Sequence, residues 1–301
     1  MVWIPGGRFR MGSDVGYPEE APSRPVEVAG FWIDATPVTN RQFARFVRET
    51  GWVTWAELAP LAEDYPGAAP EMLQPGSLVF FPTEGPVPLQ DITAWWRWTP
   101  GADWRHPTGP GSDLAGLDHH PVVHLAWQDV EAYAAWAGKD LPTEAEWEFA
   151  ARGGLDGAEF AWGDELEPHG RPMANTWQGA FPYQSRKPGG AFRTTPVRSF
   201  PPNGYGLSDM IGNVWEWTRD WWAAHPAATS GCCAPQNPVG GPREGSIDPC
   251  QPDLAIARKV LKGGSHLCAP SYCRRYRPAA RHAQPIDTST SHVGFRCVVR
   301  S

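Results

Sequence analysis

Glycine, proline and tryptophan are too frequent in this chain for a fold of long helices or long strands. The 301 residues include 32 glycines, 33 prolines and 17 tryptophans. Proline and glycine interrupt regular elements, whereas a buried indole adds apolar surface and needs a partner for its N–H group. Residues 55–117 are rich in all three types and have no sustained apolar period. We therefore predict one α+β domain over residues 1–301, with short elements and long ordered loops whose tryptophans bond to backbone carbonyls.

Capping patterns mark the helices that this chain does form. In a capping box, a hydroxyl at the helix start and a glutamine or glutamate three residues later satisfy two free backbone N–H groups. Thr39 with Gln42 and Thr143 with Glu146 fit this pattern. A further helix is predicted at about residues 128–137. We expect the three helices to end at or near glycines: Gly51, Gly138 and Gly153.

Alternating apolar residues predict strands near both ends of the sequence. Residues 2–11 contain two apolar stretches separated by Gly6 and Gly7, which predicts a hairpin. Residues 26–33 form a second strand region, and residues 293–299 a closing strand.

Charge and hydropathy exclude several classes of protein. The 26 lysines and arginines against 33 aspartates and glutamates give a net charge of −7, which offers no electrostatic footprint for nucleic acid. No apolar run approaches the roughly 18 residues of a membrane span. The first residues lack the basic start and apolar stretch of a signal peptide. We therefore expect a cytoplasmic protein that binds neither nucleic acid nor membrane, and a monomer.

Two cysteines stand out among the six. Cys268 and Cys273 lie five residues apart, and nearby cations favour the thiolate, which is the nucleophilic and metal-binding form of cysteine. Two thiolates without further ligands at zinc spacing suit a soft ion of low coordination number, such as Cu(I). The alternatives are two buried structural thiols or a redox disulfide. The cations follow in the sequence: Arg274, Arg275, Arg277 and Arg281.

The remaining cysteines carry no such pattern. Cys232, Cys233 and Cys250 lie in a Pro/Gly-rich stretch at residues 225–254, and we expect them to be dispensable for chemistry. The stretch runs between Trp217 and Cys268, so it is a candidate border of a substrate groove.

Two further clusters have both a functional and a structural interpretation. His120 and His124 are four residues apart, but the sequence between them favours extended backbone, so a core or capping role is favoured over a metal pair. Asp209, Asn213 and Glu216 place oxygen donors among glycines, which suits either a calcium loop or an acidic turn beneath tryptophans.

Eight short strings cover nearly the whole sequence: WIPGGRFRMG (3–12), PVTN (37–40), HPVVH (120–124), LPTEAEWE (141–148), PNGYGL (202–207), GNVWEW (212–217), GGS (263–265) and GFRC (294–297). In these strings and their order the chain resembles the prokaryotic members of the formylglycine-generating enzyme family, also called sulfatase-modifying factor. Most of the strings mark the fold superfamily and not the activity. The cysteine pair in residues 268–277 (CAPSYCRRYR) points to the generating enzymes themselves.

The resemblance implies a C-type-lectin-like α+β fold with little regular secondary structure. It also implies the oxygen-dependent oxidation of a cysteine in an unfolded sulfatase, within the motif Cys-x-Pro-x-Arg, to Cα-formylglycine. The Cβ hydrogen of that cysteine is removed, and the resulting thioaldehyde hydrolyses to the aldehyde.

The family's site residues map onto this sequence one by one. Its two active-site cysteines match Cys268 and Cys273, which would bind Cu(I) and accept the substrate thiol as a third sulfur ligand. Its active-site serine matches Ser265, the tryptophan beside the oxygen pocket matches Trp215, and the tyrosine before the second cysteine matches Tyr272.

The resemblance further implies structural calcium. One site maps onto Asp209, the carbonyls of Gly212 and Val214, and Glu216. The other maps onto Asn175 and Thr176 with residues near Gly189 and Ala191. Gly189 stands where many relatives have aspartate, so this second site lacks a carboxylate.

Two other functions fit the same fold. An iron-dependent sulfoxide synthase would need an N-terminal helical domain for its iron site, and the shared fold begins here at about residue 2. A non-catalytic lectin-like binding module would have no reason to keep two thiols among arginines.

Overall fold

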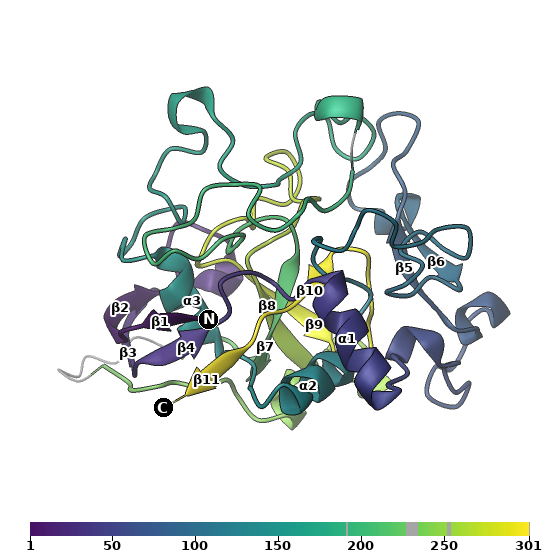
Figure 1. Ribbon diagram of the computed structural model, residues 1–301, viewed down its shortest axis with the longest axis horizontal. Coiled ribbons are helices and arrows are strands. Elements are labelled where there is room, and N and C mark those ends of the chain that lie inside the picture. Colours follow the sequence, from purple (N-terminus) through teal and green to yellow (C-terminus); the bar gives the residue numbers. More distant parts are fainter. Residues whose placement is uncertain (191, 227–233, 252–253, 301) are drawn as a thin grey trace.

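A four-stranded sheet lies at the centre of the molecule (Figure 1). The computed structural model describes residues 1–190, 192–226, 234–251 and 254–300. The strand order of the central sheet is β10-β7-β8-β9, with β10 parallel to β7 and the other pairs antiparallel. Its strands are β7 (Trp215–Trp221), β8 (Arg258–Lys262), β9 (Arg281–Pro285) and β10 (Val293–Gly294).

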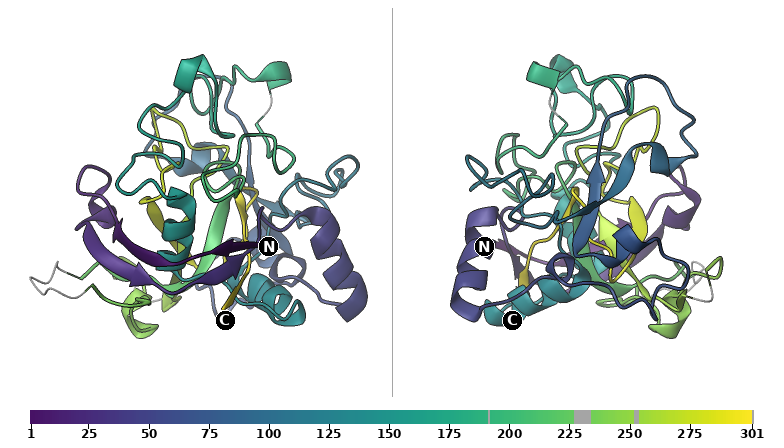
Figure 2. Two further views of the ribbon diagram at one scale, coloured as in Figure 1. Left: turned by 60° about the vertical axis from the view of Figure 1, so that its left-hand side comes forward. Right: turned by 90° about the vertical axis from the view of Figure 1, so that its right-hand side faces the viewer.

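A second, three-stranded sheet joins the two ends of the chain. β4 (Phe31–Ile33) lies between β1 (Val2–Ile4) and β11 (Val298–Arg300), and both pairs are antiparallel. The two termini therefore lie close together, as Figure 2 shows. The predicted closing strand at 293–299 is two short strands, β10 and β11, that belong to different sheets.

The predicted hairpin at residues 2–11 is wrong. β2 (Gly7–Met11) pairs with β3 (Arg24–Val28) and not with β1. Gly6 and Gly7 have φ values of 71° and 134°, and a Cβ at Gly6 would lie 2.5 Å from the carbonyl oxygen of Val28. The glycine pair thus carries the chain from one sheet to another. A further antiparallel pair is formed by β5 (Gly76–Phe80) and β6 (Trp96–Pro100).

The capping boxes are confirmed. α1 (Asn40–Thr50) and α3 (Glu144–Arg152) both begin after a threonine cap and end at a glycine in the left-handed region. α2 (Trp127–Trp136) is shifted by one residue toward the N-terminus from the predicted range of 128–137. The other described helices are single 3₁₀ turns: η1 (Pro18–Glu20), η2 (Trp55–Glu57), η3 (Pro70–Leu73), η4 (Ile92–Ala94), η5 (Pro168–Gly170), η6 (Pro188–Gly190) and η7 (Glu244–Ser246). None of the helices in the described part of the chain has the length and apolar character needed to cross a membrane.

Tryptophans fill the core, but their N–H groups follow no single rule. Trp217 donates to the carbonyl of Leu125 at 3.1 Å, as expected for a buried indole. Trp147 instead donates to the carboxylate of Glu216 at 2.8 Å. Three other buried indole N–H groups have no partner among the described residues: those of Trp98, Trp104 and Trp177. The prediction of carbonyl partners therefore holds for only part of the set.

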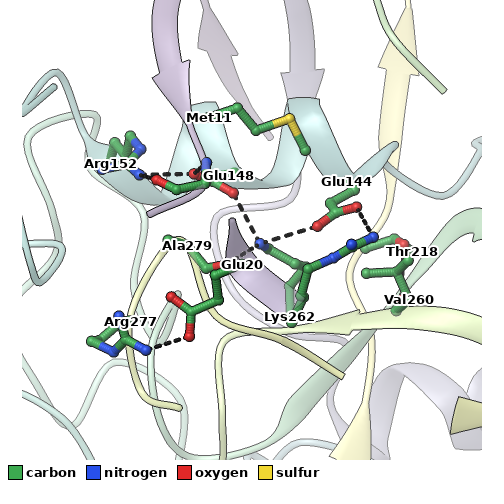
Figure 3. Close-up of polar contacts among 12 residues, drawn as sticks. Met11, Glu20, Glu144, Glu148, Arg152, Thr218, Val260, Lys262, Arg277 and Ala279 are labelled. Atoms are coloured by element: carbon green, nitrogen blue, oxygen red, sulfur yellow. Dashed lines mark hydrogen bonds and ion pairs between the residues drawn. The ribbon is translucent and has the colours of Figure 1, made fainter. Parts of the chain in front are cut away.

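Buried charges connect α3 to the central sheet (Figure 3). The ammonium of Lys262 lies 3.0 Å from a carboxylate oxygen of Glu148 and 3.5 Å from one of Glu144. Arg152 pairs with Glu148, and Arg281 pairs with Glu144, each at 2.8 Å. Burial alone would raise the pKa of Glu144, but Arg281 and Lys262 outweigh it and hold that pKa well below its ordinary value. Each carboxylate is thus compensated by two cations, which is the condition under which buried charges persist.

Candidate active site

Two glycines after β8 place the cysteine segment against the core. Gly263 and Gly264 have φ values of 93° and 70°. A Cβ on either would lie 2.8 Å from a backbone oxygen, that of Met210 or that of Arg275. Only glycine fits so close a crossing, and the chain then enters the turns that hold the two thiols.

Those turns bring the sulfur atoms of Cys268 and Cys273 to 3.1 Å from each other. Both thiols are free, and the separation is well beyond the roughly 2.05 Å of a disulfide bond. The backbone N–H of Ser265 donates to the sulfur of Cys268 at 3.4 Å, and the N–H of Cys273 donates to the carbonyl of Ala269 at 3.0 Å. The prediction that these two side chains form one site is met by this geometry.

The two thiols differ in their protonation. Burial raises the pKa of the Cys268 thiol well above its ordinary value. The hydrogen bond from Cys268 and the guanidinium of Arg275, 3.9 Å from the sulfur, lower the pKa of Cys273 to about 7. Above about pH 7 the thiolate therefore predominates on Cys273, while Cys268 keeps its proton. A thiolate is the form that binds soft metal ions.

The guanidinium of Arg275 is itself held from the opposite end of the sequence. Two of its nitrogens donate to Glu19, at 2.7 and 3.1 Å, and its plane lies over the ring of Tyr17 at 3.8 Å. These contacts point the remaining nitrogen toward Cys273.

Replacing Arg275 should therefore raise the pKa of Cys273. The rate at which iodoacetamide alkylates Cys273 should depend on pH with a midpoint near 7 in the wild type. In an Arg275→Met variant we expect this midpoint to rise, because the thiolate loses its neighbouring cation. The midpoint should move toward the ordinary thiol value of about 8.5, with about a tenfold slower reaction at pH 6.5. Peptide mapping by mass spectrometry identifies the alkylated residue. Arg274→Met is the matched control, because the side chain of Arg274 is half exposed and pairs with Glu159. An unchanged midpoint in Arg275→Met would contradict this account.

All five predicted catalytic residues line one cavity of about 580 Å³. Its wall combines the cysteine segment with strand β7 and with residues from the segment 72–98, which includes β5 and the start of β6. None of the described residues between 225 and 254 lines it, so the expectation that this stretch borders the groove has no support there. The predicted catalytic residues in the wall are Trp215, Ser265, Cys268, Tyr272 and Cys273.

Aromatic rings close the cavity around the thiols. Tyr272 stacks on Phe181, with ring centroids 4.6 Å apart and planes within 3°, and meets the edge of Trp95 at 5.4 Å. Trp215 is only 4% exposed and lies 5.8 Å from the ring of His282. Such a wall excludes water from a reactive centre.

The residues of one predicted calcium site lie in a tightly curled loop. Asp209, Gly212 and Asn213 all have φ between 55° and 75°. One carboxylate oxygen of Asp209 accepts from the N–H of Arg198 at 2.8 Å. This loop and the carbonyls of Gly212 and Val214 fit a hard cation in their chemistry.

Glu216 does not offer free oxygens to that cation. Its carboxylate accepts two hydrogen bonds from Arg296, at 2.7 and 2.8 Å, and one from Trp147. Arg296 and Glu216 are both almost completely buried. Glu216 is thus the counter-ion of Arg296, and calcium at this loop stays a prediction that rests on Asp209 and the carbonyls.

The other predicted calcium residues do not fit a calcium ion. The amide oxygen of Asn175 accepts from the ammonium of Lys187 at 2.5 Å. Thr176 follows Asn175 in the same segment, and its own N–H donates to the carbonyl of Ala174. Gly189 brings no side chain, and Ala191 lies outside the described residues. A lysine ammonium thus lies where the resemblance puts calcium.

The two histidines that were candidate metal ligands, His120 and His124, have structural roles. His124 is fully buried and bonds to Ser77 and to the carbonyl of Pro107, and burial lowers its pKa to about 4. His120 bonds to Thr194. The prediction of a core or capping role for these two histidines is confirmed.

The other cysteines lie apart from the site. Cys250 is free and exposed, and Cys297 is free and buried. Cys232 and Cys233 lie outside the described residues. Among the described residues, no group of three or more histidines, cysteines, aspartates or glutamates is arranged to hold a metal ion. The pair formed by Cys268 and Cys273 has only two such side chains, so this finding does not bear on it.

Sequence reasoning missed most of the cavity wall. Trp95 and Trp96 come from the aperiodic stretch at 55–117, where only the density of aromatic residues was a signal. Glu19 and Tyr17 support Arg275 from more than 250 residues away, and nothing in their local sequence announces it.

Short strands and few helices around a small central sheet define a C-type-lectin-like fold of the α+β class, in which the two neighbouring thiols are the candidate active site. The chain belongs to the sulfatase-modifying factor family, whose enzyme 1-like domain model matches residues 1–301.

Relatives and solved structures agree with this assignment. The chain is 54% identical over 302 residues to a formylglycine-generating enzyme of Mycobacterium tuberculosis, covering 99% of this chain and 97% of that protein. It is 48% identical over 306 residues to one of Thermomonospora curvata, covering 99% and 92%. The solved structure of PvdO from Pseudomonas aeruginosa shares the fold, with a TM-score of 0.63 at 23% identity, over 98% of this chain and 92% of that one.

Proposed function

We propose that this chain oxidises a cysteine of an unfolded sulfatase, within a Cys-x-Pro-x-Arg motif, to Cα-formylglycine. The observation that carries the proposal is the pair of free thiols, 3.1 Å apart, in a cavity walled by aromatic rings. Whole-length similarity to proteins named formylglycine-generating enzymes supports the same reaction.

Cys268 and Cys273 would hold Cu(I) in this proposal. The donor set fits, because two sulfur ligands suit a soft ion and leave room for a third. Bound copper would supply the redox chemistry with molecular oxygen. The thiol of the substrate cysteine would enter beside the two protein sulfurs without displacing them.

The chain's own residues prepare the site. Arg275 favours the thiolate of Cys273, and the N–H of Ser265 fixes the sulfur of Cys268. Trp215 and Tyr272 keep bulk water from the thiols and leave the cavity open to an extended peptide. The substrate cysteine would lose one hydrogen from Cβ and one from sulfur to give a thioaldehyde. These two electrons and two protons, with two more of each from the reductant and solvent, would reduce molecular oxygen to water. Water would then replace the sulfur of the thioaldehyde to give the aldehyde and hydrogen sulfide.

A peptide assay tests the proposal. The protein is incubated with copper, oxygen, a reductant and a Cys-x-Pro-x-Arg peptide, and the products are analysed by mass spectrometry after trapping of aldehydes with an aminooxy probe. We expect the aldehyde only when oxygen is present and the peptide contains cysteine. A peptide with serine in place of cysteine is the control. Bound copper with no aldehyde formed would contradict the proposed reaction.

We also propose that one calcium ion binds at Asp209 and the carbonyls of Gly212 and Val214. An ion that binds only the folded state stabilises it by mass action. We therefore expect a chelator to lower the melting temperature of the wild-type protein and to have no further effect on an Asp209→Ala variant. Melting of the wild type that does not respond to the chelator, or metal analysis without calcium, would contradict this site.

A further inference from the structure

Lys187 places its ammonium group against a buried amide, and no described carboxylate forms an ion pair with it. Its Nζ atom lies 2.5 Å from the amide oxygen of Asn175, which is only 1% exposed. Among the described residues, Lys187 makes no ion pair, in contrast to Lys262, which faces two glutamates. An ammonium in such surroundings loses hydration without a counter-ion, so its position requires another reason.

That reason lies in the orientation of Asn175. The amide nitrogen of Asn175 donates to the side-chain oxygen of Asn213 at 3.1 Å and to the carbonyl of Arg193 at 3.3 Å. These bonds fix its oxygen on the opposite side, facing Lys187. A fixed amide oxygen without a donor would be left unsatisfied in the interior, and a cation satisfies it.

The same contacts lead directly to the cysteine segment. The carbonyl of Asn175 accepts from the N–H of Asn213, and the carbonyl of Asn213 accepts from the N–H of His266. The N–H of Trp177 donates to the carbonyl of Cys268 at 2.9 Å. A cation at Asn175 therefore supports the backbone on which the thiols lie.

We propose that Lys187 replaces a structural calcium ion at Asn175, so that a covalently attached cation holds this part of the protein together. Calcium is repelled from the position by the ammonium, and Gly189 supplies none of the carboxylate oxygens that calcium prefers. The proposal goes beyond the proposed reaction and does not depend on it, because its readouts are melting and metal content.

The geometry allows the exchange to be reversed. Gly189 has a φ of 67°, a conformation that aspartate adopts more readily than most side chains. A Cβ built there meets no heavy atom within 4 Å. The double variant Lys187→Met/Gly189→Asp removes the ammonium and returns a carboxylate to the loop.

The experiment measures calcium per chain and melting temperature, with and without calcium, for four proteins: wild type, Lys187→Met, the double variant and Arg186→Met. We expect Lys187→Met to melt roughly 3–6 °C below wild type, because the oxygen of Asn175 loses its charged donor. The double variant should take up one more calcium ion per chain than wild type and regain stability only when calcium is present. Arg186→Met, which removes an exposed cation from the same loop, should match wild type in both measurements.

Two results would overturn the proposal. The first is a double variant that binds no additional calcium. The second is a Lys187→Met protein as stable as wild type. If Lys187→Met does not fold, Asn175→Ser decides the matter through metal content alone. Unchanged calcium content supports the built-in cation, whereas the loss of one calcium ion shows that Asn175 binds the metal in the wild type.

Discussion

Turnover should disappear when either Cys268 or Cys273 becomes serine, while the fold survives. The two sulfurs lie 3.1 Å apart and neither supports β8 or β9 through a disulfide. A single thiolate with a hydroxyl beside it is a poor ligand set for Cu(I), because the soft ion prefers sulfur. We expect the rate of aldehyde formation to fall by roughly a thousandfold or more, about 4 kcal/mol of transition-state stabilisation. Copper binding should fall below one equivalent.

Three measurements define this result. Mass spectrometry of the peptide gives turnover, metal analysis gives the copper content, and thermal melting shows that the variants remain folded. Cys250→Ser is the matched control, because that thiol is free and exposed and lies outside the cavity. Near-normal turnover in Cys268→Ser or in Cys273→Ser, with peptide and oxygen supplied, would refute the copper assignment.

The largest effect on stability should come from Glu216→Ala. This change leaves the guanidinium of Arg296 without its carboxylate at a position with no solvent exposure. Removal of one partner of a buried ion pair costs about 3–5 kcal/mol in the free energy of unfolding. Urea unfolding at neutral pH measures the loss, and peptide turnover should fall only as far as unfolding dictates.

A double variant separates the ion pair from other roles of Glu216. Glu216→Leu combined with Arg296→Met removes both charges, so we expect it to be more stable than Glu216→Ala. The difference between wild type and Glu216→Ala should be the same with and without a chelator, because the carboxylate is committed to Arg296 and Trp147. A loss below about 1 kcal/mol would contradict the buried ion pair, and a loss that vanishes in the chelator would show that Glu216 acts as a metal ligand instead.

The helices could be predicted because their signals are local. Thr39 with Gln42 and Thr143 with Glu146 lie within one helical turn, and the structure has both boxes. The strands could not be paired in the same way. Gly6 and Gly7 resemble a hairpin turn locally, but the register of β2 is decided by β3, and β1 pairs with β4.

In the candidate site, too, only the local features could be predicted from the sequence. The two cysteines are five residues apart, so their pairing was visible in the sequence. The cation that adds to the hydrogen bond from Cys268 in lowering the pKa of Cys273 was visible only as one of four arginines. The choice of Arg275 depends on Glu19 and Tyr17, which reach it through the fold. The substitution of Lys187 for a metal was likewise invisible, because it depends on where a flexible side chain ends.

The sheet that joins β1, β4 and β11 has a consequence for how the molecule is made. Its central strand, Phe31–Ile33, is synthesised early but pairs with Val298–Arg300, almost the whole length of the chain away. Contacts of such high sequence separation slow folding, because the loop between them must close first. The ribosome must release nearly the entire polypeptide before this sheet can be completed. We therefore expect nascent chains to depend on chaperones until residues 298–300 can pair, because the apolar face that the finished sheet buries, with Ile4, Phe31 and Ile33, stays exposed to aggregation in the meantime.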